Sequence, residues 1–199
     1  QTIDAVFISH LHEDHVNGLE FLLDYCDVKK IFLPLINSNV RLSLHVYHTI
    51  EQTSISPIVR TILDFDENSQ PNIGDAQIVF VPETGEDSKP ELAGVGQNIE
   101  NVNSGSLSQN PKIGLPLNIN NWVFIPFNFR NHARSIELNN KLSADNLTFS
   151  NIDEFNDIWS DSVKREKLKD IYKSIPGSLN TNSLTLYSGP ELNNGRPFR

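Results

Sequence analysis

The 199-residue chain contains no methionine and one cysteine, Cys26. A single cysteine cannot form an internal disulfide, which favours a reducing compartment and predicts a cytoplasmic protein. No apolar run approaches the roughly 20 residues of a membrane-spanning helix, and the first residues lack the basic and apolar pattern of a secretion signal. The sequence therefore predicts no membrane segment.

Basic residues are also scarce, because 16 Lys and Arg stand against 25 Asp and Glu and leave a net charge of −9. This balance argues against a broad basic surface for nucleic acid. A content of 38% hydrophobic and 21% charged residues is ordinary for a globular chain. Since the chain begins at Gln1 and holds no methionine, we expect it to be a piece of a longer protein.

The densest polar cluster is Ser9–His15, which packs three imidazoles and two carboxylates into seven positions. It follows the apolar run Ile3–Ile8, which predicts a buried strand. Such a strand delivers the cluster to a loop at its carboxyl end, where α/β folds usually place their chemistry. Neutral imidazole and carboxylate are common ligands of divalent metal ions. The stretch therefore predicts a metal site.

The spacing within this cluster suggests two ions. In an extended segment, His10 and His12 point their rings the same way. Asp14 and His15 follow where the chain turns into a helix expected from Val16, so they face the same pocket from its other side. We predict one ion held by His10 and His12 and a second held by Asp14 and His15.

These residues resemble the metallo-β-lactamase superfamily, whose signature is His-x-His-x-Asp-His after a strand and before a helix. The resemblance covers about residues 3–23, and Asp4, Gly18 and Leu19 also stand where the family commonly has Asp, Gly and an apolar residue. It implies an α/β (α+β) fold, a metallo-β-lactamase-like αββα sandwich that is incomplete at both ends in this chain. The implied cofactor is a divalent metal, expected as two Zn²⁺, although Mn²⁺ and Fe accept the same ligands.

The rest of the chain predicts alternating helices and strands. We expect helices over 16–23, 39–52, 55–65 and 151–175, and strands over 29–35, 76–82 and 122–129. Residues 83–121 hold five of the ten glycines and few large apolar residues, which predicts a flexible insertion. The expected organisation is one partial domain over 1–189 and a disordered or truncated tail over 190–199.

Three residues after the strand at 122–129 are further candidates. His132 follows this strand as His10 follows the first, so it is either another metal ligand or a capping or surface residue. Arg130 and Arg134 flank it and either hold an anionic group of the substrate, as guanidinium does with phosphate or carboxylate, or are surface charges.

Two other groups have a plainer reading. His45 and His48 share a face of the helix at 39–52, where a plain surface role is favoured over ligation. Five basic residues between 163 and 173 form a local positive stretch. A solvated amphipathic helix with Leu168, Ile171 and Tyr172 inward is favoured there over a nucleic-acid contact.

A second, shorter resemblance lies at Leu179–Gly189, an Asn-rich stretch containing Ser-Leu. It is similar to a late strand in one branch of the superfamily, the DNA-internalisation competence proteins and their soluble relatives. That branch has a later Gly-Asp pair whose Asp bridges the metals, and then a further His. Neither occurs between Gly189 and Arg199, so we expect the 199-residue segment alone to be inactive.

The two resemblances imply an enzyme, a hydrolase that uses a metal-activated water, in which Asp14 both binds metal and orients the water. The leading substrate class is a phosphodiester or nucleic acid, because a metal pair recruits phosphate without a basic surface. The alternative substrate is a small ester, lactone or thioester. The alternative of another class is a non-catalytic metal-binding or regulatory module with a degenerate site.

Overall fold

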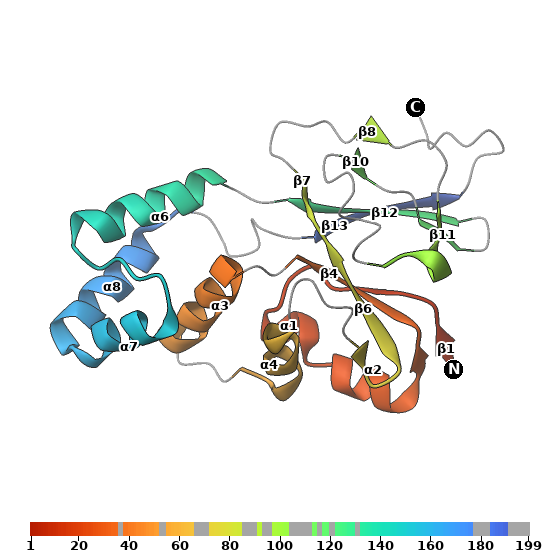
Figure 1. Ribbon diagram of the computed structural model, residues 1–199, viewed down its shortest axis with the longest axis horizontal. Helices are drawn as coiled ribbons and strands as arrows, with labels where there is room; N and C mark the ends of the chain where they lie inside the picture. Colours follow the sequence, from red (N-terminus) through yellow and green to blue (C-terminus); the bar gives the residue numbers. More distant parts are fainter. Residues whose placement is uncertain are drawn as a thin grey trace. The chain divides into compact units, whose positions relative to one another are not determined.

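The structure, a computed structural model, describes residues 1–35, 38–51, 55–65, 72–84, 91–92, 97–103, 113–114, 117–119, 122–129, 132–176 and 184–190. It contains two compact units (Figure 1). Unit 1 comprises residues 1–35, 56–130 and 182–199, and unit 2 comprises residues 36–55 and 131–181. The expectation of one partial domain over 1–189 stays a prediction.

The first sheet of unit 1 has the strand order β2-β4-β6-β5. Its strands β2 (Val6–Phe7), β4 (Lys30–Pro34) and β6 (Ala76–Val81) run parallel, and β5 (Asn72–Ile73) is an antiparallel edge. Strands β4 and β6 are buried along most of their length, in keeping with their largely apolar sequences. The strand expected over 3–8 is instead two short ones, because β1 (Thr2–Ile3) pairs separately with β3 (Asp27–Val28).

The second sheet of unit 1 has the order β13-β12-β11-β9, and β7 (Glu83–Thr84) also pairs with β12. The long strands β12 (Trp122–Phe129) and β13 (Leu184–Pro190) are antiparallel. The strands β11 (Leu117–Ile119) and β9 (Gln97–Asn98) extend the sheet, and β8 (Glu91–Leu92) and β10 (Ile113–Gly114) form a separate pair. Of the tail expected from residue 190, Pro190 ends β13, and residues 191–199 lie outside the described residues.

One hydrophobic core joins the two sheets. It contains Phe32 of β4 and Val79 of β6 from the first sheet, and Leu117 of β11 and Leu184 of β13 from the second. Helices α1 (Glu13–Val16), α2 (Leu19–Tyr25) and α4 (Pro57–Asp64) belong to the same unit. The mixture of helices and two sheets joined by one core confirms the α/β class and is consistent with a metallo-β-lactamase-like fold.

Part of the segment 83–121 differs from the flexible insertion that its composition predicts. Ile99, Val102 and Leu117 are buried in the core between the sheets. The ammonium of Lys30 on β4 donates to the carbonyl oxygens of Glu100, at 2.9 Å, and Val102, at 2.6 Å. These contacts are distant in the sequence, so local composition does not reveal them. Residues 85–90, 93–96, 104–112, 115–116 and 120–121 lie outside the described residues, and the prediction stands untested there.

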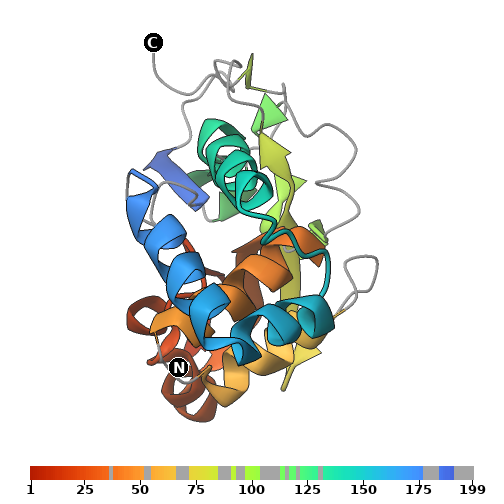
Figure 2. The same ribbon diagram turned by 90° about the vertical axis from the view of Figure 1, so that its left-hand side faces the viewer.

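Unit 2 consists of helices around a core of its own (Figure 2). The helices are α3 (Ser38–Glu51), α6 (His132–Ala144), α7 (Ile152–Ser160) and α8 (Ser162–Ser174). The helical character expected over 151–175 is confirmed, although the segment forms two helices, because Asp161 ends α7 and begins α8. Its carboxylate accepts hydrogen bonds from the backbone N–H groups of Val163, at 2.9 Å, and Lys164, at 3.1 Å. An aspartate in this position is a strong helix N-cap.

The basic stretch lies on α8, where several of its charges have partners within unit 2. Lys167 pairs with Asp145 at 2.6 Å, and Lys169 pairs with Glu166 at 3.1 Å. The guanidinium of Arg165 lies 5.9 Å from the centre of the Trp159 ring. Leu168 and Ile171 are buried, which supports the amphipathic surface helix. None of the helices in the described part of the chain is long and apolar enough to cross a bilayer.

Candidate metal centre

The loop that carries the histidines is tied to both sheets of unit 1. Strand β2 ends at Phe7, and the backbone N–H of Ile8 then donates to the carbonyl of Phe32 on β4 at 2.9 Å. The next carbonyl, that of Ser9, accepts a hydrogen bond from the N–H of Leu184 on β13 at 2.8 Å. The loop therefore leaves the carboxyl end of a parallel strand, as the sequence predicts, and begins from a backbone held on two sides.

A short helix completes the loop earlier than expected. Helix α1 begins at Glu13, inside the polar cluster, with His12 as its extended N-cap residue. His10 and His12 consequently belong to extended chain, whereas Asp14 and His15 stand on the first helical turn. Leu11 and Val16 are buried on either side of the turn and hold it against the interior. The change from extended chain to helix thus explains how Asp14 and His15, four and five residues after His10, turn toward it.

Three of the predicted ligands meet in the structure. One ligand atom from each of His10, Asp14 and His15 lies within 4.8 Å of the others. The ring centres of His10 and His15 are 4.0 Å apart, and Nε2 of His15 is 3.4 Å from a carboxylate oxygen of Asp14. Within the described part of the chain, no other three His, Cys, Asp or Glu side chains meet at this distance. Three such ligand atoms this close together are compatible with a divalent-ion site.

His12 lies beside this group rather than within it. Its ring centre is 4.5 Å from that of His10, with the two rings perpendicular. The structure therefore groups His10 with Asp14 and His15, whereas the sequence suggested pairing it with His12. The assignment of two residues to each of two ions stays a prediction.

The environment of His10 fits a metal. Its side chain is only 8% exposed, and its Nε2 atom is buried with no hydrogen-bond partner. A buried polar atom without a partner costs about 1–3 kcal/mol, and a metal ion would use that lone pair. Burial, together with the neighbouring His12 and His15, lowers the pKa of His10 from 6.5 to about 4. The ring is therefore neutral at physiological pH, the form that binds metal.

The metal-free chain is expected to lose stability as the pH falls from about 6.5 to about 4. Because burial disfavours the protonated ring, the unfolded chain binds more protons in this window, and the free energy of unfolding rises with pH. For one proton the slope is at most about 1.4 kcal/mol per pH unit. Urea unfolding at several pH values across the window measures it. His10→Gln should flatten the dependence, and an unchanged slope in that variant would contradict the assignment.

The remaining candidates lie in unit 2 or outside the described residues. His132 is the first residue of α6, although its side chain is outside the described part, and Arg130 is wholly outside it. Arg134 is half-buried on α6. The ligand role of His132 and the anion-binding role of both arginines stay predictions. The plain surface role expected for His45 and His48 is wrong, because the ring of His45 packs edge-on to Phe155 at 6.0 Å and His48 is buried.

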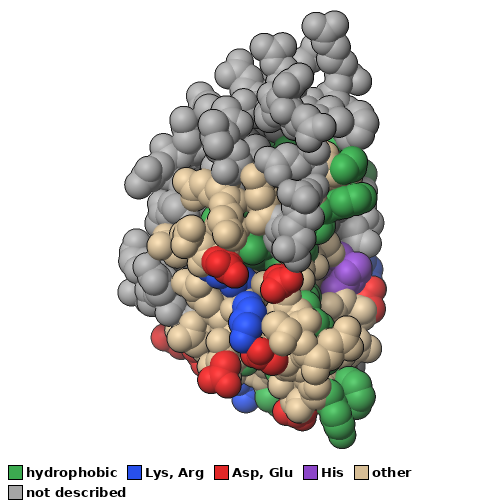
Figure 3. All heavy atoms as spheres, turned by 90° about the vertical axis from the view of Figure 1, so that its right-hand side faces the viewer, with side chains coloured by type: hydrophobic (Ala, Val, Ile, Leu, Met, Phe, Trp, Pro, Cys, Tyr) green, Lys and Arg blue, Asp and Glu red, His purple; other side chains and the backbone are tan. Residues whose placement is uncertain are grey.

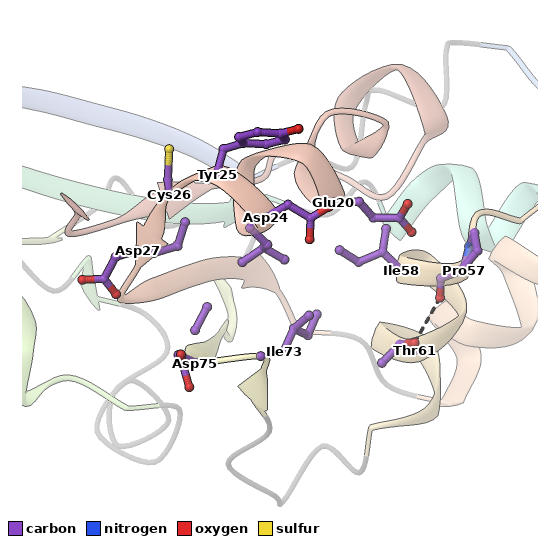
Figure 4. A pocket seen from close by; sticks show the side chains of 14 residues that line it. Glu20, Asp24, Tyr25, Cys26, Asp27, Pro57, Ile58, Thr61, Ile73 and Asp75 are labelled. Atoms are coloured by element: carbon purple, nitrogen blue, oxygen red, sulfur yellow. Dashed lines mark hydrogen bonds between the residues drawn. The ribbon is translucent and has the colours of Figure 1, made fainter. Parts of the chain in front are cut away.

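Sequence reasoning missed a cavity of about 840 Å³ in unit 1. Figure 4 shows carboxylates around it that come from α2, from β3 and from the turn before β6. These are Glu20, Asp24, Asp27 and Asp75. The cavity lies where β6 begins, whereas the metal loop follows the end of β2 in the same parallel sheet, so it is separate from the metal cluster. Its acidic residues are scattered along the chain, and no local signal marks them.

The comparisons with known proteins agree with this geometry. The family model described as the metallo-beta-lactamase superfamily matches residues 1–45, the segment that contains the metal loop. That superfamily indicates a metal-dependent hydrolase in general and leaves the substrate open. Neither the curated proteins nor the solved structures gave a match. Over residues 1–45, this chain is therefore similar to the metallo-beta-lactamase superfamily.

Proposed function

We propose that the protein is a hydrolase in which a metal-activated water attacks a phosphodiester or nucleic-acid substrate. The observation that carries the proposal is the partnerless, buried Nε2 of His10, within a cluster that also contains Asp14 and His15. His10, His12, Asp14 and His15 would hold the metal, with two zinc ions as the expected content. A divalent ion supplies Lewis acidity that brings water to ionisation near pH 7, against about 15.7 in bulk.

The chain's own residues have distinct tasks in this reaction. His10 is buried and neutral, so it contributes a rigid nitrogen ligand. The side chain of Asp14 is 75% exposed and therefore faces the solvent from which water arrives. Its carboxylate has two oxygens, so one can bind metal while the other orients the attacking water. No side-chain nucleophile is necessary.

The substrate class rests on chemistry and on the similarity at Leu179–Gly189. A metal site attracts phosphate oxygens directly. The face shown in Figure 3 carries many acidic side chains, in keeping with the net charge of −9, so long nucleic acid would not be held by a broad basic surface there. This favours a substrate gripped at the scissile phosphate. The single cysteine supports action in the cytoplasm.

Metal content and hydrolysis test the proposal together. The protein in its full natural length is dialysed against trace zinc and manganese, analysed for bound metal, and assayed with bis(p-nitrophenyl) phosphate, single-stranded DNA and p-nitrophenyl acetate. Metal-dependent cleavage of the phosphodiesters supports the proposal, and cleavage of the acetate alone supports the ester alternative. Bound metal without turnover indicates a binding module. A protein that retains no metal overturns the mechanism.

A further inference from the structure

One hydroxyl group contacts two of the candidate ligands. Oγ of Ser9 lies 3.0 Å from Nδ1 of His10 and 3.2 Å from Nδ1 of His15. Both contacts are within hydrogen-bond distance. The two histidines come from different local structures, extended chain and the turn of α1, so Ser9 connects the two halves of the metal loop.

These contacts bear on which nitrogen of each ring is free. A neutral imidazole carries one N–H and one lone pair, and the hydrogen bond at one nitrogen decides which form the other takes. When Nδ1–H donates to a hydroxyl, Nε2 keeps its lone pair and can bind a metal ion. The buried Nε2 of His10 has no partner, and Nε2 of His15 is the atom that lies near Asp14. Both Nε2 atoms are thus left to the cluster.

We propose that Ser9 is a positioning residue that sets the tautomer of both rings, so that each ring keeps its Nε2 lone pair for metal. Its oxygen has two lone pairs and accepts a hydrogen bond from Nδ1–H of His10 and of His15, while its own hydrogen points elsewhere. Both Nε2 lone pairs are then free to bind metal. The inference rests on the proposed metal site and adds a residue that does not itself bind metal.

The backbone around Ser9 explains why its hydroxyl can act in this way. Its carbonyl is bonded to Leu184 on β13, and the preceding N–H is bonded to Phe32 on β4. The hydroxyl therefore projects from a segment anchored to both sheets. Partners that orient ligand histidines through their second nitrogen typically contribute about 10- to 100-fold to metal affinity.

Zinc affinity and ring tautomers test the proposal in Ser9→Ala, Ser9→Thr and wild type. Affinity is measured by competition with a chelator, and tautomers by ¹⁵N–¹H correlation spectra of the imidazoles. We expect Ser9→Ala to bind zinc about 10- to 100-fold more weakly and Ser9→Thr, which keeps the hydroxyl, to recover most of the loss. In zinc-bound wild type, Nδ1 of His10 and His15 should carry the proton. Ser143→Ala, on the exposed surface of α6, is the matched control and should change neither quantity.

Each outcome is decisive. Unchanged zinc affinity in Ser9→Ala, or zinc-bound rings protonated at Nε2, would overturn the role of Ser9 while leaving the metal site intact. If wild type binds no zinc, the proposed function fails, and the metal-free spectra still decide the role of Ser9. A metal-free His10 protonated at Nε2 overturns that role. Urea unfolding of all variants identifies any affinity loss that comes from misfolding.

Discussion

His10→Ala is expected to weaken metal binding by more than about 100-fold and to abolish metal-dependent hydrolysis. Removal of a residue that only orients a ligand through a hydrogen bond already costs about 10- to 100-fold, and removal of a direct ligand should cost more. His10 is also the least exposed member of the cluster and the one whose Nε2 has no other partner. Metal content after dialysis and a chelator-competition titration measure the loss.

The matched control for this substitution is His45→Ala. His45 is on α3 of unit 2, where its ring packs against Phe155. That variant should retain metal with wild-type affinity, although it can lower stability slightly. Equal metal affinity in His10→Ala and wild type would show that the cluster is not the metal site.

Phe32→Ala is expected to destabilise unit 1 by about 3–5 kcal/mol, the usual cost of truncating a buried phenylalanine. The Phe32 side chain is fully buried in the core between the two sheets, and its ring stacks on Phe7 with centres 4.7 Å apart. Small domains are stable by only about 5–15 kcal/mol, so this loss is a large fraction of the total. Urea unfolding followed by circular dichroism measures it.

The same variant should also weaken metal binding. Loss of the ring lets β4 shift, and the backbone carbonyl of residue 32, which the substitution keeps, accepts a hydrogen bond from the N–H of Ile8 at the start of the metal loop. Phe21→Ala provides the matched control. Phe21 is 66% exposed on α2 and stacks on the exposed Tyr25, so its removal should cost less than about 0.5 kcal/mol. Similar losses in the two variants would contradict the assignment of the core.

The secondary structure followed local sequence where the signals were strong. Strands β4 and β6 and helices α3 and α4 lie close to where their apolar patterns predicted them. The predicted helix boundaries were wrong where a polar side chain caps a helix. Asp161 divides the expected helix at 151–175, because its carboxylate satisfies the first N–H groups of α8. The apolar residues of this segment have helical spacing, but that spacing does not show where a capping residue divides the helix.

The sequence by itself determined the ligand types and the order in which they leave a strand and enter a helix. His10, Asp14 and His15 lie within six consecutive residues, so their meeting depends mainly on local backbone geometry. The same holds for the contact between Ser9 and both rings. The sequence alone did not mark Ser9 as a functional residue, because a serine next to histidines is not a typical sign of a metal site.

Tertiary structure alone decided what supports that loop. Lys30 reaches carbonyls about 70 residues away, and the carbonyl of Ser9 meets the N–H of Leu184 on a strand at the far end of the chain. The acidic cavity likewise joins Glu20 to Asp75. Such pairs depend on how the two sheets and their helices pack. Local periodicity reports only whether a residue is buried, so the identity of its distant partner follows from the packing.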